Sequence, residues 1–235
     1  MLDFAQFEWL SFDCYGTLID WESGILGYLR PLLERKRCFV QDDAVLYLYS
    51  QLEPREQAGR YRCYREVLAS VMKGFARELR FDVNIADAAG LAESVREWQP
   101  FLDTVPGLHR LQSRYKLAVL SNIDDDMFAQ SARKLEIRFD CVVTAQQVRS
   151  YKPALRNFEV LLQRLAVPHT RLLHVAESLY HDVKPAHSFG IPTVWVNRRQ
   201  GRTATASKPA NVSPDLEVPD IGKLAELAVG GDPTA

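Results

Sequence analysis

The second half of the chain alternates between two hydrophobic patterns. Short apolar runs, which are typical of buried strands, are separated by segments with apolar positions three and four residues apart, which are typical of helices. Strands are predicted over residues 116–122, 141–144, 171–176 and 192–197, and helices over 108–115, 127–135, 157–165 and 182–189. Because strands that alternate with helices pair in parallel through the crossover helices, this pattern predicts a parallel sheet.

A further strand is predicted near the N-terminus. The apolar run Phe7-Glu8-Trp9-Leu10 leads into Ser11-Phe12, and Gly16 lets the backbone turn shortly afterwards. Asp13 therefore falls at the carboxyl end of this strand. In an open parallel sheet, that edge is where ligands bind.

The region between this strand and the rest of the sheet is helical in pattern. Helices are predicted over residues 21–33, 42–52, 55–79 and 85–97. The segment 98–107 contains two prolines and a glycine and is interpreted as a return linker. We therefore expect an α/β fold, with a Rossmann-like, doubly wound parallel sheet in residues 1–21 and 105–235 and an all-helical insertion in residues 22–104.

The C-terminal region carries weaker signals. Residues 200–214 are polar and rich in Ser, Thr, Ala and Pro, which predicts a mobile surface loop. A short edge strand over 216–218 and a helix over 221–228 would complete the fold, and residues 230–235 are expected to fray.

Composition narrows the classes of function. The chain has 235 residues, 47% of them hydrophobic and 25% charged, with a net charge of -1. This balance argues against nucleic acid or an anionic membrane as the main partner. No apolar stretch approaches the ~20 residues of a membrane span and no leader pattern is present, so we expect a cytoplasmic protein. The four cysteines are widely spaced, which predicts neither a zinc site nor a disulfide framework.

Polar residues follow four of the predicted strands. Asp13 and Thr17 follow the first, Ser121-Asn122 end the second, Tyr151-Lys152-Pro153 come after the third, and Glu177-Ser178 with Asp182 follow the fourth. Each group alone is typical of a turn or a helix N-cap. Four groups at one sheet edge predict a reaction centre instead.

These motifs resemble those of the haloacid dehalogenase superfamily, most of whose members are phosphatases. The resemblance is carried by Asp13 in FDCYGTL, Ser121-Asn122 in VLSN, Lys152 in YKP, and Glu177 with Asp182 in HVAESLYHD. It extends over essentially the whole chain and implies that the helical insertion is a cap.

The resemblance implies that Asp13 is a covalent nucleophile. An ammonium group within ~4–6 Å, here that of Lys152, would keep Asp13 ionised. Ser121, Asn122 and Thr17 can donate hydrogen bonds to a bound carboxylate or phosphate. Asp182 would pair with Lys152, orient the hydrolytic water, or only cap the following helix.

Tyr15 bears on which reaction this is. Phosphatases of the family carry a second Asp at this position to protonate the leaving group, and a phenol with a pKa near ~10 is a poor substitute. The motif is instead similar to the type II 2-haloacid dehalogenase branch, in which halide departs without a proton. In this interpretation Asp13 forms an ester with a small anionic substrate such as a 2-haloacid, and no cofactor is needed. Ser121, Lys152 and the amides after Asp13 would bind the carboxylate, Asn122 the halide, and Tyr15 would pack beside the reacting carbon.

Two features favour the alternative, a Mg²⁺-dependent phosphatase with an aspartyl-phosphate intermediate. Glu177 stands at a position where dehalogenases of that branch carry Ser. In the phosphatase alternative, Asp13, Glu177 and Asp182 would be the metal ligands. The cap Arg with which those dehalogenases cradle halide also has no clear counterpart here. A second alternative is a non-catalytic relative that binds a small anion.

The cap residues that face the site are not fixed by pattern. Candidates are Trp21, Glu53, Tyr61 and Tyr64, each expected to pack rather than to contact substrate. Analogy with the dehalogenase branch also implies a homodimer.

Overall fold

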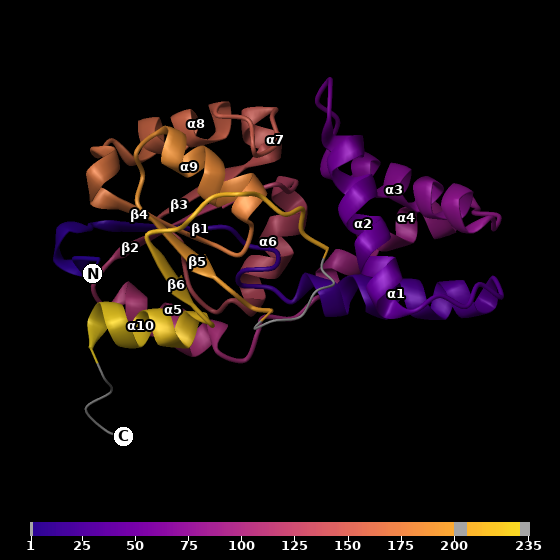
Figure 1. Cartoon of the computed structure of the whole chain (residues 1–235), viewed down its shortest axis with the longest axis horizontal. Coiled ribbons are helices and arrows are strands. Elements are labelled where there is room, and N and C mark those ends of the chain that lie inside the picture. The colour runs from indigo at the N-terminus through magenta and orange to yellow at the C-terminus, as the bar shows by residue number, and fades with distance from the viewer. Residues whose placement is uncertain (1, 200–205, 231–235) are drawn as a thin grey trace.

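The core of the molecule is a parallel sheet (Figure 1). In residues 2–199 and 206–230, which the computed structural model describes, the sheet has six strands in the order β3-β2-β1-β4-β5-β6. Their bounds are β1 Trp9–Phe12, β2 Lys116–Ser121, β3 Cys141–Thr144, β4 Leu172–Ala176, β5 Thr193–Val196 and β6 Leu216–Val218. Every neighbouring pair is parallel, which confirms the predicted fold class.

Helices cover both faces of the sheet. On one face α8 (Arg156–Leu165) and α9 (Lys184–Ser188) bury Phe158 and Leu161 against Leu120 of β2. On the other face lie α5 (Thr104–Gln112) and α10 (Ile221–Val229), which bury Leu108 and Leu224 (Figure 1). The short helix α7 (Ala145–Val148), which the hydrophobic pattern did not predict, and α6 (Asp125–Lys134) follow β3 and β2.

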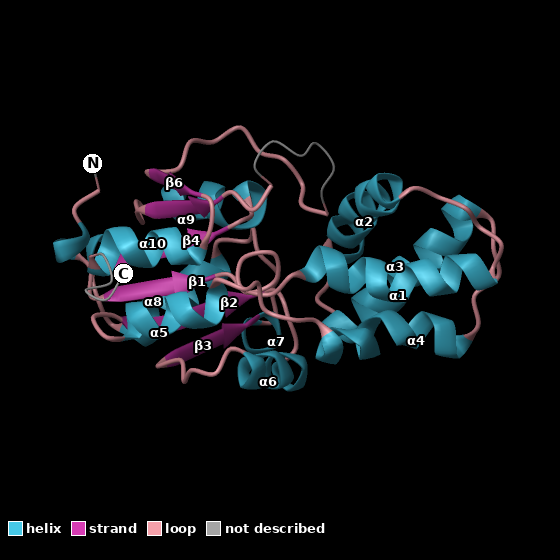
Figure 2. Ribbon diagram, turned by 90° about the horizontal axis from the view of Figure 1, so that it is seen from below, coloured by secondary structure: helices cyan, strands magenta, loops and turns pink. Residues whose placement is uncertain are grey.

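Four further helices gather at one end of the molecule, beyond the sheet (Figure 2). They are α1 (Trp21–Arg35), α2 (Asp42–Gln57), α3 (Tyr64–Leu79) and α4 (Ile85–Ser94), followed by the short turn η2 (Val95–Glu97). Their apolar side chains share one cluster with those of the sheet. Trp98 contacts α1 closely, because a Cβ added at Gly24 would lie 2.3 Å from its ring.

Two predicted boundaries in this region are wrong. The helix predicted over 55–79 does not begin at Arg55: α2 continues through Pro54 to Gln57, and a non-helical segment separates it from α3. Ala58 is extended and ends the helix, and Gly59 after it has a φ of +90°, a conformation that favours glycine. The return linker is also shorter than predicted, since α5 begins at Thr104 and includes Pro106 in its first turn, where a missing N–H is tolerated.

The C-terminal predictions divide into three outcomes. The edge strand and the last helix are confirmed by β6 and α10. The mobile surface loop is wrong for Ala206 and Ser207, which are buried against the rest of the chain, while residues 200–205 and the end 231–235 lie outside the described residues. No helix in the described ranges is long and apolar enough to cross a membrane.

Candidate active site

The predicted strand-end residues surround a small cavity between the sheet and the α1–α4 helices. It lies beyond β1, which pairs with β2 on one side and β4 on the other, so it occupies the point where the strand order reverses. Its volume is about 30 Å³, little more than the space of a water molecule. A substrate can therefore enter only when surrounding groups move.

Asp13 is held at the rim of this cavity. Its backbone N–H continues the sheet by donating to the Val175 carbonyl, and its Oδ2 accepts a hydrogen bond of 2.8 Å from the Thr17 hydroxyl. Gly16 makes the turn that follows, with a φ of +93°, and the Trp21 ring lies close to its Cα. The side chain is only 9% exposed, so its orientation is fixed by these contacts.

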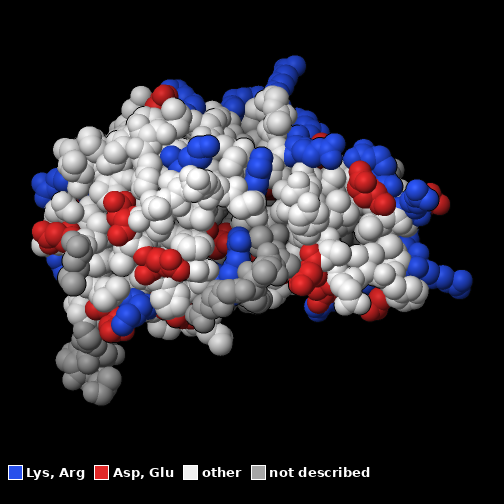
Figure 3. Space-filling view, viewed as in Figure 1, with Lys and Arg blue, Asp and Glu red and all other residues white. Residues whose placement is uncertain are grey.

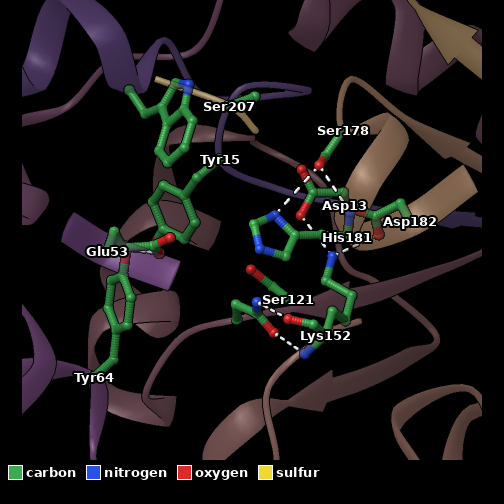
Figure 4. Close-up of a pocket in the computed structure, with 12 residues that line it drawn as sticks. Asp13, Tyr15, Glu53, Tyr64, Ser121, Lys152, Ser178, His181, Asp182 and Ser207 are labelled. Carbon is green, nitrogen blue, oxygen red and sulfur yellow. Dashed lines mark hydrogen bonds and ion pairs between the residues drawn. The ribbon is translucent and has the colours of Figure 1, made fainter. Parts of the chain in front are cut away.

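Lys152 lies between two carboxylates (Figure 4). Its Nζ donates to Asp13 Oδ1 at 2.8 Å, to Asp182 Oδ1 at 2.6 Å and to the Leu120 carbonyl at 2.8 Å. The predicted contact between this ammonium and Asp13 is thus present. All three ammonium hydrogens are used inside the protein, so the expected direct contact from Lys152 to a substrate carboxylate is not supported by this geometry.

The two carboxylates have opposite pKa shifts. Burial raises the pKa of Asp13, with Lys152 and Thr17 opposing the rise and Asp182 adding to it. Burial also acts to raise the pKa of Asp182, but Lys152 and the His174 imidazole outweigh it and hold that pKa below its usual value. Asp182 is thereby kept as the anion beside Asp13.

A hydrogen-bonded chain supports Asp182 from beneath the sheet edge. His174 of β4 contacts Asp182 Oδ1 through Nε2 at 2.9 Å and Ser11 Oγ through Nδ1 at 2.8 Å. Asp182 itself lies on a single π-helical turn, η4 (Leu179–Val183), a type of turn that is frequent at functional sites. With Oδ1 fixed in this way, Asp182 Oδ2 remains buried without a hydrogen-bond partner among the described residues.

Two more polar atoms at the cavity also lack partners in the described part of the chain: Ser121 Oγ and His181 Nε2. Burial lowers the pKa of His181 to about 4, so its ring is neutral at pH 7. Buried polar groups without partners are costly, and at a cavity they indicate groups that serve a ligand. His181 was not predicted, because a His inside a helical pattern carries no signal of its own.

Thr17 and Asn122, both predicted to bind substrate, form hydrogen bonds within the protein. The single hydroxyl hydrogen of Thr17 is donated to Asp13, and its oxygen accepts from the Glu177 N–H, so Thr17 fixes the orientation of the Asp13 carboxylate. Asn122 lines the cavity, but its side chain accepts from the Lys152 N–H at 2.7 Å and donates to the Lys152 carbonyl at 3.0 Å. Its main contacts therefore hold Lys152.

Tyr15 lies in the cavity wall with its hydroxyl turned away from the nucleophile. The hydroxyl contacts Ser131 Oγ of α6 at 2.8 Å, and the ring meets Trp98 edge-on. Burial raises the pKa of Tyr15 well above its usual value, which makes it a still poorer proton donor than a free phenol. Burial likewise raises the pKa of Cys14, so its thiolate is disfavoured.

The predicted metal ligands do not form a metal centre in the described residues. Glu177 forms an ion pair with Arg199 and accepts from Ser207 Oγ at 2.5 Å, which occupies both of its carboxylate oxygens. The Lys152 ammonium lies between Asp13 and Asp182, where a divalent cation would have to share both anions. No group of three or more His, Cys, Asp or Glu side chains in these ranges is placed to hold a metal ion. The residues present do not fit Mg²⁺.

Three of the four cap candidates line the cavity, namely Trp21, Glu53 and Tyr64, whereas Tyr61 lines a neighbouring groove. No Arg lines the cavity in the described part of the chain. Glu53 lies between the helices predicted over 42–52 and 55–79, so the pattern did not place it on a helix. In the structure, α2 carries Glu53 in its last full turn.

A carboxylate delivered by the first strand of a parallel sheet, paired with a buried lysine and covered by inserted helices, defines a class of covalent α/β hydrolases. The chain belongs to the haloacid dehalogenase-like hydrolase family, whose sequence model matches residues 10–196. It is therefore a hydrolase of that family.

Individual relatives refine the comparison. The chain is similar to the (S)-2-haloacid dehalogenase of Pseudomonas sp. strain YL, at 27% identity over 93% of each chain. A shorter similarity, 29% identity over 55% of this chain and 58% of the relative, is to a glyceraldehyde 3-phosphate phosphatase of Methanothermobacter thermautotrophicus. The fold matches the L-2-haloacid dehalogenase of Xanthobacter autotrophicus solved with chloropropionic acid covalently bound, with a TM-score of 0.78, 21% identity, and coverage of 95% of this chain and 99% of that one.

Proposed function

We propose that the protein hydrolyses 2-haloacids through an ester on Asp13. The observation that carries the proposal is the pairing of Asp13 with Lys152 at the cavity, together with Tyr15 in place of a leaving-group acid. A halide can leave without a proton, whereas an alkoxide leaving a phosphate ester needs one. Similarity to the (S)-2-haloacid dehalogenase of Pseudomonas sp. strain YL supports the same reaction.

The reaction has two steps. Asp13 Oδ attacks the carbon that bears the halogen; the new C–O bond forms as the C–X bond breaks, and the halide leaves with the bonding electrons. Water then adds to the Asp13 carbonyl carbon, the ester C–O bond breaks, and the 2-hydroxyacid is released with one proton. The free Asp182 Oδ2 and the neutral His181 are the groups at the cavity suited to orient that water.

The substrate carboxylate needs donors that the protein has not already used. Ser121 Oγ has no partner in the described residues, and no hydrogen bond there uses the N–H of Cys14 or Tyr15. We assign the carboxylate to these three donors. Lys152 acts on the substrate only through Asp13 and Asp182.

A halide-release assay tests the proposal. L-2-chloropropionate and p-nitrophenyl phosphate are supplied separately, each with Mg²⁺ or with EDTA. We expect chloride release that EDTA does not change, and loss of that release in Asp13→Asn, while Asp43→Asn on the surface of α2 behaves like the wild type. Nitrophenol release that EDTA abolishes would support the phosphatase instead, and silence with both substrates would support a non-catalytic anion-binding relative.

Three features expected from the sequence remain proposals. They are a separate cap unit in residues 22–104, a homodimer, and a cytoplasmic location without nucleic-acid or membrane partners. Charges of both signs are interspersed on the face seen in Figure 3, which agrees with a small-molecule substrate.

A further inference from the structure

Glu53 contributes a carboxyl group to the cavity from the cap side. It lies on α2, is 4% exposed, and lines the same cavity as Asp13 (Figure 4). We propose that Glu53 is a neutral carboxylic acid that donates a hydrogen bond to the halogen as it leaves the carbon attacked by Asp13. This inference rests on the proposed dehalogenation and names a further residue for it.

The contacts of Glu53 leave one of its two carboxyl oxygens without a donor. Tyr64 donates to Oε1 at 3.1 Å, and the Gln57 amide donates to the same oxygen. Oε2 has no hydrogen bond in the described part of the chain and is not among the fully enclosed polar atoms. Two donors on one oxygen identify it as the carbonyl oxygen, which leaves Oε2 to carry the proton and present it to the cavity.

Among the described residues, no cation forms an ion pair with Glu53. The three hydrogens of the Lys152 ammonium are donated elsewhere, and Arg62 and Arg65 pair with other carboxylates at the surface. A buried carboxylate without a counterion is strongly disfavoured, so the group keeps its proton.

Titratable groups face Glu53 from every side. They are Tyr49 of the same helix, Tyr64 of α3, and Asp13, Tyr151, Lys152 and His181 of the core. Burial is the largest influence and raises the pKa of Glu53 to about 7; the Tyr64 hydroxyl lowers it, Asp13 raises it and Lys152 lowers it.

The leaving group needs a donor of this kind. Negative charge that develops on a halogen in a closed cavity is stabilised only by groups aimed at it. An ionised Glu53 would repel both that charge and the substrate carboxylate, whereas the neutral acid offers an O–H. Asn122 is already bonded to Lys152, and no Arg lines the cavity in the described residues. In this step the halide takes the electron pair of the C–X bond while Glu53 keeps its proton.

The pH profile of halide release provides the test. In the wild type, kcat with L-2-chloropropionate should fall about tenfold per pH unit above the pKa of Glu53. Glu53→Gln should keep a flat profile to pH 9, because Tyr64 and Gln57 orient the amide oxygen and leave its NH₂ to donate. Glu53→Ala should lose about tenfold or more at pH 6, and more with 2-fluoropropionate than with 2-bromopropionate, since fluoride is the stronger hydrogen-bond acceptor. Asp43→Asn, which removes an exposed charge from the same helix, should match the wild type.

An alkaline loss that persists in Glu53→Gln, or a fall in Glu53→Ala that is equal for fluoride and bromide, would overturn the inference and leave the dehalogenation intact. A readout without turnover is the ¹³C resonance of the Glu53 side-chain carboxyl in protein labelled at Glu Cδ, assigned by its absence in Glu53→Gln. We expect a midpoint near pH 7, and a midpoint below pH 5 would end the proposal. Absence of halide release by the wild type would refute the proposed function, and the midpoint alone would then decide whether Glu53 is a neutral acid.

Discussion

Replacing Lys152 with Met tests the charge balance of the site most directly. The Lys152 side chain is 2% exposed and its ammonium contacts two buried carboxylates, so its removal leaves Asp13 and Asp182 together without the positive charge between them. Breaking a buried pair by removing one partner costs about 3–5 kcal/mol. We expect Lys152→Met to lower the free energy of unfolding by that amount at pH 8.

The cost should shrink at low pH. The pKa of Asp182 is depressed in the folded wild type, so the stability it contributes is present above the pKa of the unfolded chain and is lost as pH falls through the folded value. In Lys152→Met this contribution is already absent, and one carboxyl can take up a proton. The difference between wild type and variant should therefore be smaller at pH 4 than at pH 8.

A double-mutant cycle checks the magnitude. Urea unfolding at both pH values is compared for the wild type, Lys152→Met, Asp182→Asn and the double variant. Because Asp182→Asn removes the repulsion that Lys152→Met creates, we expect a coupling of about 2 kcal/mol or more at pH 8. Additive effects, or an equal cost at pH 4 and pH 8, would show that Lys152 stabilises the fold through packing and not through charge.

Two further predictions concern groups on, or bound to, the α1–α4 helices. Asp124 of the core accepts hydrogen bonds from the first two N–H groups of α3, those of Tyr64 and Arg65, at 2.9 and 3.0 Å. Asp124→Ala should therefore lower the free energy of unfolding by about 1–2 kcal/mol, measured by urea unfolding, and raise KM, measured by halide release. An unchanged KM would separate this contact from closure of the α1–α4 helices over the site. The pKa of Glu53 is raised from 4.5 to about 7, so the folded protein holds this proton more tightly than the unfolded chain, and the free energy of unfolding falls as pH rises through that window. Relative to Glu53→Gln, the wild type should lose about 3 kcal/mol of unfolding free energy between pH 4.5 and pH 8, measured by urea unfolding. A difference between the two proteins that stays constant with pH would contradict the assignment.

The sheet and the residues at its edge were predictable because they depend on local pattern. Apolar runs ending in polar residues placed Asp13, Ser121, Lys152 and Asp182 at the carboxyl ends of parallel strands, and topology then forces such ends together. The contact between Asp13 and Lys152 was therefore predictable from the sequence, whereas the role of Asp13 as nucleophile stays a prediction.

Side-chain roles were less predictable, because they depend on which partner reaches each atom first. Thr17 and Asn122 were expected to bind substrate, but neighbouring groups use their hydrogen bonds. Glu177 was expected to bind Mg²⁺, but the Arg199 guanidinium, which comes later in the chain, neutralises it. Glu53 was a candidate for facing the site but was expected only to pack, whereas α2 continues through Pro54 and places its carboxyl group at the cavity.

The walls of the cavity are scattered along nearly the whole chain. Asp13 comes well before Lys152, Asp182 and Ser207 along the chain. During synthesis the Asp13 carboxylate thus exists before the groups that pair with it and enclose it. A fragment that ends before Lys152 would carry Asp13 without the ammonium that its proposed role requires.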